Sequence, residues 1–394
     1  MQRFFLLFGI RLLMSKFTLC RCTVSVLVPA FLLTACLATP TIELPLPPGL
    51  SRETVAEKLL PQSPVAVSPD GSLLALVRAD GLFLRSLQGG AEKKLSAEHP
   101  VALAFKPGGA ELAAAFPTAD GSRLQRFATS DGEILGKISF PGRCEALLSR
   151  QGEWLAFVTT LQSFRFGGNL SSRLLRWDGA QAPVEELLND VTLDRSTLAD
   201  KEALLATLRP QLSPYGDEIL FLRLHDPPAF DPYIAVVLRH LETRSERTVA
   251  KLPKLSGSAI YLADGELVAY SDGLMVRIIE PWSDKEQQRL PMSDLRLAAS
   301  PSSEILWLDN ALLRSNGQIV TSFSPSAQPV TFLTDGRLLL RDKERLSLLS
   351  GLPAGALEPP TPASDRLLLL RKWRAEGLID VREYTEQVGK RKVD

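Results

Sequence analysis

Histidine, cysteine and acidic side chains could act here as nucleophiles, bases or metal ligands. The 394 residues include four cysteines and three scattered histidines, His99, His225 and His240. No G-x-S-x-G, H-E-x-x-H, C-x-x-C or Walker-type stretch occurs. This pattern predicts no catalytic residues, no metal site and no cofactor, although ligands from distant repeats could still meet in a folded chain.

The composition describes a globular protein. Lys and Arg number 45, Asp and Glu number 45, and 45% of the residues are hydrophobic. A chain of this kind can bury a large core, which argues against disorder. The zero net charge gives no electrostatic basis for nucleic-acid binding.

The N-terminus has the features of an export signal. Residues 1–35 carry four basic side chains and no acidic one, and an apolar run of 13 residues extends from Thr23 to Ala35. That length fits a signal peptide and is too short to span a bilayer. We expect the true start at Met14, because Lys16 and Arg21 then form a compact basic region before the apolar run. The alternative is a longer signal that begins at Met1 and includes the apolar stretch Phe4–Leu13.

The apolar run ends in Leu33-Thr34-Ala35-Cys36. This resembles the lipobox of bacterial lipoproteins, in which small residues admit the signal peptidase and the cysteine thiol carries a diacylglycerol. The resemblance implies lipid attachment at Cys36, peptidase recognition of Leu33, Thr34 and Ala35, and a palmitate-bearing anchor in a bacterial cell envelope. Leu37, in place of Asp, implies the outer membrane, facing the periplasm. The alternative is ordinary signal cleavage near Ala38.

Removal of residues 1–35 leaves 41 basic and 45 acidic side chains, a net charge of −4, so an anchored chain gains no attraction to anionic lipid. Of the two cysteines that remain, Cys144 lies in the apolar stretch Cys144–Leu148. We expect it to be a buried, unreactive thiol.

After a Pro-rich spacer, a turn motif recurs along the chain. In the clearest copy, Ser68-Pro69-Asp70-Gly71 fits a type I turn between a short strand and the apolar strand Leu73–Val77. Asp80-Gly81 then offers a hairpin turn into a third strand, Leu82–Leu87. The weaker copies begin at Phe105, Leu148, Leu212, Leu262, Ala299 and Leu333.

Seven copies, mostly about 40 residues apart, predict a seven-bladed β-propeller over 60–352. A single sheet cannot bury both faces, whereas radial packing in a ring can. The Ser68–Gly71 turn resembles the WD-like repeats of bacterial TolB-type propellers. The other Asp-Gly pairs are interpreted as turns and not as ligands.

The interval between Ser149 and Ser213 exceeds one blade, which indicates an insertion around 162–208. Gln162–Ser172 is typical of an extended hairpin tip, and Ser196–Leu208 of a helix with Leu198, Leu205 and Leu208 on one face. Insertions in repeat proteins often map to the binding face. We therefore name Phe164, Arg165 and Phe166 as candidate partner contacts, with a packed decoration of the rim as the alternative.

Residues 353–362 read as a Pro/Gly linker before a helical tail at 363–394. Ser364 or Asp365 can cap a helix that stops at Gly377, and Asp380 with Glu383 can open a second helix. Two such short helices are unstable alone, so they should dock on the propeller or on another subunit. Trp373 is a further candidate contact.

The leucine run Leu367–Leu370, Gly377, Leu378-Ile379 and Glu383-Tyr384 resemble the SHOCT family of short C-terminal modules. That resemblance implies oligomerisation or recruitment of a partner, which makes self-association through the tail possible.

These features favour a non-enzymatic, lipid-anchored protein-binding or scaffold protein with an unknown envelope partner. The alternative is a propeller enzyme of the lyase or lactonase class, acting on a carbohydrate or small ester at the central channel. A third possibility is a stress-sensing lipoprotein whose tail self-associates.

Overall fold

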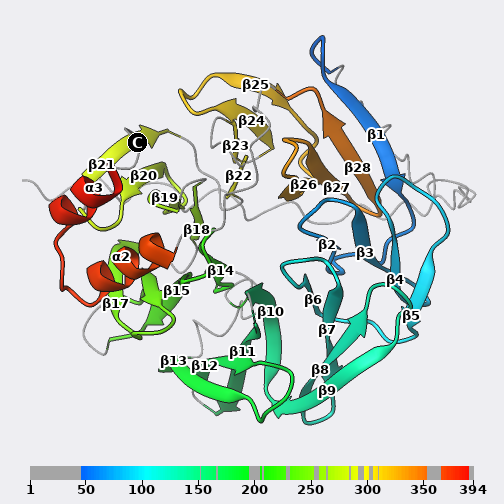
Figure 1. The fold of residues 1–394 in the computed structure, drawn as a ribbon, viewed down its shortest axis with the longest axis horizontal. Helices are drawn as coiled ribbons and strands as arrows, with labels where there is room; N and C mark the ends of the chain where they lie inside the picture. Colours follow the sequence, from blue (N-terminus) through cyan, green and yellow to red (C-terminus); the bar gives the residue numbers. More distant parts are fainter. Residues whose placement is uncertain are drawn as a thin grey trace, which may run out of the picture. The chain divides into compact units, whose positions relative to one another are not determined.

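The computed structural model describes residues 46–150, 152–165, 167–194, 205, 208–227, 231–252, 257–262, 265–283, 285–291, 297–300, 305–308, 310–352 and 365–389. These residues belong to one compact unit, Glu43–Asp394. Within them, strands form seven four-stranded antiparallel sheets placed radially in a ring (Figure 1). The predicted seven-bladed β-propeller is confirmed. Each of the seven turn motifs falls between the innermost strand of one blade and the strand that follows it in the chain.

The first three blades follow the chain from the inner strand outward. Blade 1 contains β2 (Ala66–Val67), β3 (Leu73–Arg78), β4 (Gly81–Ser86) and β5 (Lys93–Ser96). Blade 2 contains β6 (Ala102–Phe105), β7 (Glu111–Thr118), β8 (Gly121–Ala128) and β9 (Ile134–Pro141). Blade 3 contains β10 (Arg143–Arg150), β11 (Glu153–Phe164), β12 (Gly167–Trp177) and β13 (Val184–Asp194).

Blades 4 to 6 repeat this order. Blade 4 contains β14 (Gln211–Leu212), β15 (Glu218–His225), β16 (Tyr233–His240) and β17 (Glu246–Leu252). Blade 5 contains β18 (Ser258–Tyr261), β19 (Val268–Ser271), β20 (Val276–Glu280) and β21 (Lys285–Leu290). Blade 6 contains β22 (Leu297–Ala299), β23 (Ile305–Leu308), β24 (Ala311–Arg314) and β25 (Ile319–Ser322).

Blade 7 closes the ring with a strand from the other end of the described chain. Its inner strands are β26 (Ala327–Phe332), β27 (Leu338–Asp342) and β28 (Arg345–Ser350), and β1 (Ser51–Ala56) pairs antiparallel with β28 as the outermost strand. In Figure 1, β1 in blue lies beside β28 in orange. β1 lies before residue 60, where the predicted propeller begins. The repeat pattern did not reveal it, because a closing strand carries no turn motif of its own.

The predicted turn at Ser68 is confirmed. Gly71 donates its N–H to the Ser68 carbonyl at 2.8 Å, and Gly71 has a φ of +71°, which glycine adopts at little cost. The Ser68 hydroxyl accepts a hydrogen bond from the N–H of Leu73, and Asp70 accepts from the hydroxyls of Ser68 and Ser72. Polar side chains thus connect the turn to the strand that follows.

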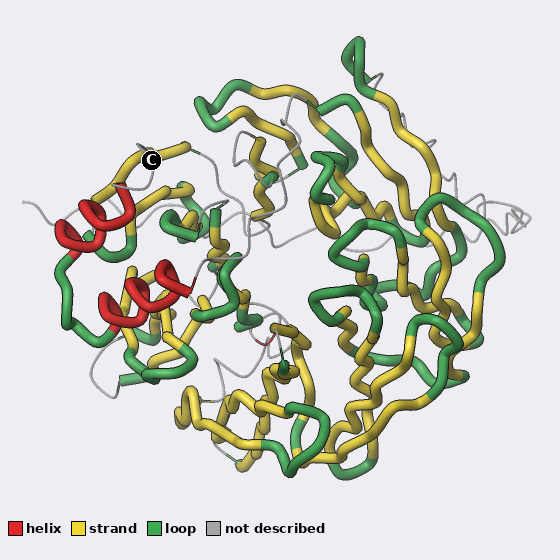
Figure 2. The backbone as a smooth tube through the Cα atoms, in the orientation of Figure 1, coloured by secondary structure: helices red, strands yellow, loops and turns green. Residues whose placement is uncertain are grey.

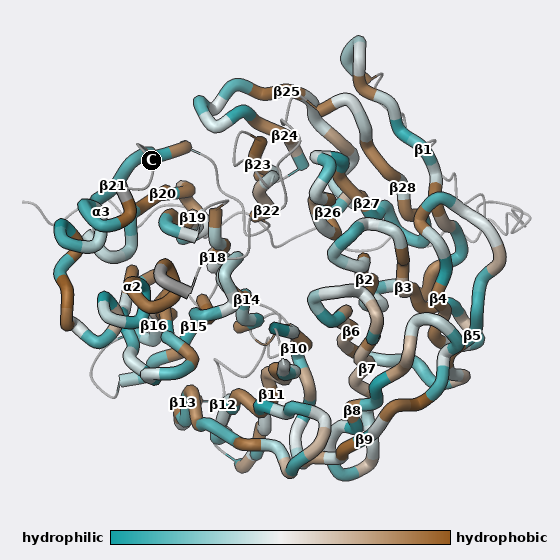
Figure 3. Tube along the Cα trace, in the orientation of Figure 1, coloured by the Kyte–Doolittle hydropathy of each residue, from teal (hydrophilic) through white to brown (hydrophobic). Residues whose placement is uncertain are grey.

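The core lies between neighbouring blades. Ala113 and Ala115 of blade 2 pack against Trp154 and Ala156 of blade 3, all at most 1% exposed. Figure 3 shows brown, hydrophobic segments along the middle strands of the blades. Cys144 joins this cluster, and burial, aided by Glu145, raises its pKa to about 12. The expectation of a buried thiol is confirmed, and a raised pKa disfavours the reactive thiolate.

The predicted hairpin between Gln162 and Ser172 forms the far end of β11 and β12, where Phe164 pairs with Gly167. The expected helix Ser196–Leu208 lies outside the described residues, apart from Leu205 and Leu208. Both of these leucines are buried in the core beside blade 4.

The described residues contain two complete helices, α2 (Asp365–Ala375) and α3 (Val381–Gly389). Both appear in red in Figure 2, over the part of the ring formed by blades 4 and 5. None of the helices in the described residues is long and apolar enough to cross a membrane. Residues 1–45, which include Met14, Leu33, Thr34, Ala35 and Cys36, lie outside the described residues, as do Phe166 and the predicted linker 353–362.

Candidate functional site

The two tail helices have well-formed ends. At the start of α3, Asp380 accepts a hydrogen bond from the Glu383 N–H at 2.7 Å, and Glu383 accepts one from the Asp380 N–H at 3.0 Å. This is the predicted capping box. After α2, Gly377 donates to the Arg374 carbonyl and Leu378 to the Trp373 carbonyl. That pair of bonds, with φ of +72° at Gly377, is a Schellman motif.

α2 docks on the propeller through a buried arginine. The side chain of Arg371 has an exposure of 0%, and its nitrogen atoms donate to Asp217 Oδ2 at 2.5 Å, Glu218 Oε2 at 2.8 Å and Glu266 Oε1 at 2.5 Å. Its guanidinium also lies 4.7 Å from the centre of the Tyr215 ring. The guanidinium therefore has three anionic partners and an aromatic face.

A second arginine strengthens the contact. Arg374 Nη1 donates to Glu266 Oε2 at 2.7 Å. Its guanidinium lies 4.6 Å from the centre of the Trp282 ring and 4.0 Å from that of Tyr384 on α3. The Tyr384 hydroxyl donates to Glu266 Oε1 at 2.9 Å, so both helices meet the propeller at one carboxylate.

The regular turns of two neighbouring blades place these carboxylates. In blade 4, Ser213 donates its N–H to the Glu218 carbonyl, and in blade 5, Leu262 donates to the Leu267 carbonyl. Asp217 and Glu266 each stand one residue before the acceptor, so they hold equivalent positions. We call Asp217, Glu218, Glu266, Tyr215 and Trp282 the arginine socket.

In the socket, burial and the neighbouring charges shift the pKa values in opposite directions. Burial opposes ionisation of Asp217, but Arg371 outweighs it and keeps the pKa of Asp217 below its usual value. At Glu218 burial dominates, and with the negative charges of Asp217 and Glu266 it raises the pKa to about 7 despite Arg371. Glu218 Oε1 is buried without a hydrogen-bond partner. Burial lowers the pKa of Arg371, yet the three carboxylates outweigh it and the pKa ends above its ordinary value.

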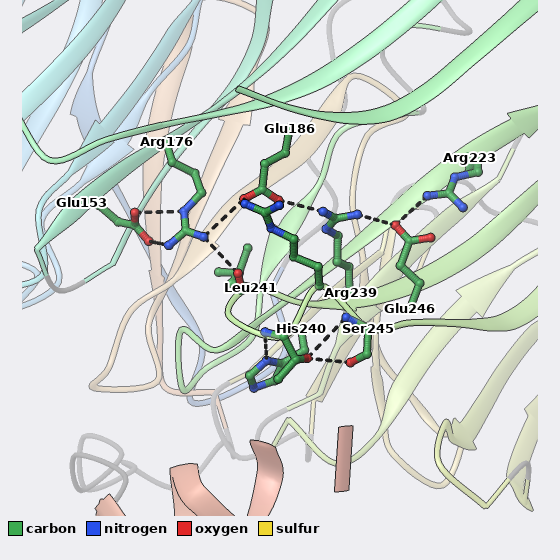
Figure 4. A network of polar contacts seen from close by, with 11 residues as sticks. Glu153, Arg176, Glu186, Arg223, Arg239, His240, Leu241, Ser245 and Glu246 are labelled. Carbon is green, nitrogen blue, oxygen red and sulfur yellow. Dashed lines mark hydrogen bonds and ion pairs between the residues drawn. The ribbon is translucent and has the colours of Figure 1, made fainter. Parts of the chain in front are cut away.

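A second ionic network joins blades 3 and 4 on the same side of the ring (Figure 4). Glu186, nearly fully buried, binds Arg176 of its own blade and Arg239 of blade 4. Arg176 continues to Glu153, and Arg239 continues to Glu246. The network fixes the end of β16, which pairs with Glu218 at the socket.

The histidines belong to the framework. His240, which ends β16, accepts a hydrogen bond from the Thr243 N–H on Nδ1, and burial lowers its pKa. His225 stacks on Tyr233. His99 bonds to the Ala79 carbonyl. Among the described residues, no group of His, Cys, Asp and Glu has the arrangement of a metal site.

The candidate contact residues lie at two different places. Phe164, 55% exposed, and Arg165 stand at the far end of β11, while Glu153 at its near end joins the network beside the socket. The eleven residue steps of β11 from Glu153 to Phe164 span about 36 Å. Trp373, 38% exposed, is on α2, the helix that docks at the socket. The structure therefore does not bring Phe164 and Trp373 together.

The tail exposes three large apolar side chains beside its charged ones. Leu369, Trp373 and Leu378 are exposed by 43%, 38% and 66%. Leu369 and Trp373 are one helical turn apart, and the Schellman motif brings Leu378 to Trp373. We call these three residues the outer patch. α2 thus buries Arg371 and Arg374 beside Leu370 and exposes Leu369 and Trp373. Its polarity is in this respect the reverse of an ordinary amphipathic helix, which exposes its charged side chains.

Sequence reasoning missed the socket. Arg371 follows four leucines, and a charged residue beside such an apolar run is normally predicted to face the solvent. The available signal was acidic residues beside the turns of two consecutive repeats, Asp217-Glu218 and Glu266. In the other direction, the expectation that the tail would dock was correct, and its partner is the chain's own propeller.

The raised pKa of Glu218 makes stability depend on pH. Because its folded pKa of about 7 exceeds its ordinary value of 4.5, Glu218 contributes stability that is present below pH 4.5 and lost as pH rises through 7. Between pH 5 and pH 8, we expect the free energy of unfolding of Glu218→Gln to fall by about 2–3 kcal/mol less than that of wild type. Urea unfolding of both proteins at the two pH values measures this difference.

Every other titratable group is common to both proteins, so the difference between the two pH profiles isolates Glu218. Arg289 keeps the pKa of Glu286 below its usual value, so Glu286→Gln should leave the profile unchanged. Parallel profiles for wild type and Glu218→Gln would contradict the assigned electrostatics.

Comparison with known proteins identifies no family. No family model matches the chain, and no curated protein matches its sequence. Solved propellers resemble it in structure. The β-propeller domain of Cps50 (Swd1) from Myceliophteria thermophila is 14% identical with a TM-score of 0.49, covering 76% of this chain and 99% of that domain. A chain of the mitotic checkpoint complex is 10% identical with a TM-score of 0.49, covering 76% of this chain and 92% of that chain.

Proposed function

We propose that the protein is a lipid-anchored scaffold of a bacterial cell envelope that binds a partner protein through the outer patch of its docked tail. The observation that carries this proposal is the reversed polarity of α2. Its arginines face the propeller, and Leu369, Trp373 and Leu378 face outward.

The outer patch has the chemistry of a protein contact. Exposed single hydrophobic residues need no explanation, but a contiguous set on a fixed element is typical of an interaction site. Burial of the apolar Trp and Leu side chains by a partner is favourable, and Trp is enriched among residues that dominate binding energies. Figure 3 colours much of α2 brown, which marks its hydrophobic residues.

The docking contact makes this patch a rigid platform. Arg371 and Arg374 fix α2 to two blades at once, and Tyr384 fixes α3 to the same carboxylate. A preorganised surface loses less entropy on binding than a free helix pair does. The ionic contact on the inner side thus supports recognition on the outer side.

The proposed anchor is Cys36, preceded by Leu33, Thr34 and Ala35. Fourteen residues, 37–50, lie between Cys36 and Ser51, the first residue of the closing strand β1. A tether of that length spans at most about 50 Å when extended. The propeller would then work within that reach of the membrane, which we propose is the outer membrane on its periplasmic side.

The anchor predicts that one cysteine controls membrane attachment. In a Gram-negative host, Cys36→Ala should lose incorporation of a labelled palmitate analogue and move from the detergent-extracted to the soluble fraction. Cys144→Ala is the matched control, because Cys144 is buried in the propeller, and it should stay labelled. Labelled, membrane-bound Cys36→Ala would contradict the anchor.

The outer patch predicts a partner that depends on the tail. We expect Trp373→Ala combined with Leu378→Ala to reduce cross-linking to an envelope protein by tenfold or more in intact cells, since each buried anchor contributes over about 1 kcal/mol. The control is Leu274→Ala combined with Ile319→Ala, two side chains that are each 60% exposed on the blades.

Phe164→Ala forms a third arm, because Phe164, Arg165 and Phe166 were the other candidate contacts. Loss of the partner with Phe164→Ala, and its retention in the tail variant, would transfer recognition to the hairpin and overturn the assignment to the outer patch.

A further inference from the structure

The socket beneath α2 holds arginine with unusual completeness. Nε, Nη1 and Nη2 of Arg371 each donate to a carboxylate, and Tyr215 lies against the guanidinium face. Lysine could not reproduce this set, because its ammonium is a point charge without a planar fork or a stacking face. The neighbouring place, between Trp282 and Glu266, takes Arg374 by the same chemistry.

We propose that this socket is a receptor for an arginine-bearing helix of a partner protein, and that the chain's own α2 occupies it as a displaceable plug. The recognised element has two arginines three residues apart, the spacing of Arg371 and Arg374. This inference concerns the propeller face under the tail, and depends on neither the outer patch nor the lipid anchor.

Comparison among the blades supports a dedicated receptor. In blade 2, Glu111, whose carbonyl closes the turn as that of Glu218 does in blade 4, is bound by Lys106 and Arg126 of its own blade. In blade 3, Glu153 is bound by Arg150 and Arg176 of its own blade.

Blades 4 and 5 depart from this arrangement. There the guanidinium groups that bind Asp217, Glu218 and Glu266 come from the tail, more than 100 residues away in sequence. The acidic side chains of these two blades are therefore arranged for a cation supplied from outside the ring.

The plug is held in a way that permits exchange. α2 and α3 bury few hydrophobic side chains, chiefly Leu370 and Tyr384, so ion pairs carry most of the contact. The net free energy of buried ion pairs is small, because water solvates both partners again when they separate. Glu218 Oε1 and two nitrogen atoms of Arg374 also lack hydrogen-bond partners, so the fit of the plug leaves room for a better ligand.

Binding of a synthetic helix in trans tests the receptor. The probe is a fluorescent peptide with the sequence of residues 365–389, called the arginine peptide, and its lysine analogue carries lysine at positions 371 and 374. We expect the full-length double variant Arg371→Ala/Arg374→Ala, whose plug is weakened, to bind the arginine peptide at least tenfold more tightly than wild type. The lysine analogue should bind at least tenfold more weakly than the arginine peptide.

Adding Asp217→Asn and Glu266→Gln to the double variant should abolish peptide binding. Adding Glu98→Gln, an exposed acid in the loop between blades 1 and 2, should not. Equal affinity of wild type and the double variant for the arginine peptide would overturn the proposal. So would equal affinity of the double variant for the arginine peptide and its lysine analogue.

Hydrogen exchange on the wild-type protein gives a second test that needs no substitution. Saturating arginine peptide should displace the plug and raise the exchange rate of the α2 amides at least tenfold, while the lysine analogue should leave it unchanged. Unchanged α2 exchange at saturating arginine peptide would overturn the proposal, even if the double variant fails to fold.

Discussion

The burial of one guanidinium, that of Arg371, sets the conditions that the surrounding structure has to meet. A charge removed from water is tolerated only with close counter-charges and satisfied donors. Asp217 and Glu218 from blade 4 and Glu266 from blade 5 provide them. The position of the tail therefore depends on two blades being held in register, and through them on the closed ring.

Two features hold that register. The pairing of β1 with β28 closes the ring, so no blade is left with an open neighbour. The network around Glu186 ties blade 3 to blade 4 beside the socket. The chain thus uses hydrophobic packing to assemble the blades and buried ion pairs to attach the tail. Hydrophobic packing carries no titratable group, whereas the ion pairs that attach the tail respond to pH and to competing cations.

Local features were predictable from sequence, whereas long-range pairings were not. The Ser68–Gly71 turn, the Gly377 stop and the Asp380–Glu383 capping box follow from rules that act within a few residues. The closing strand Ser51–Ala56 carries no repeat motif. The burial of Arg371 depends on acidic residues 105 to 154 positions away, which no local pattern reveals.

The central claim is that Arg371 fixes the tail to the propeller, and hydrogen exchange of the α2 amides measures this directly. The comparison is between wild type, Arg371→Ala and Arg382→Ala, whose arginine is 87% exposed on α3. Removing one partner of a buried ion pair costs about 3–5 kcal/mol, so Arg371→Ala should lose at least a hundredfold of α2 protection while the blade strands keep theirs. Arg382→Ala should match wild type. Wild-type protection of α2 in Arg371→Ala would contradict the account.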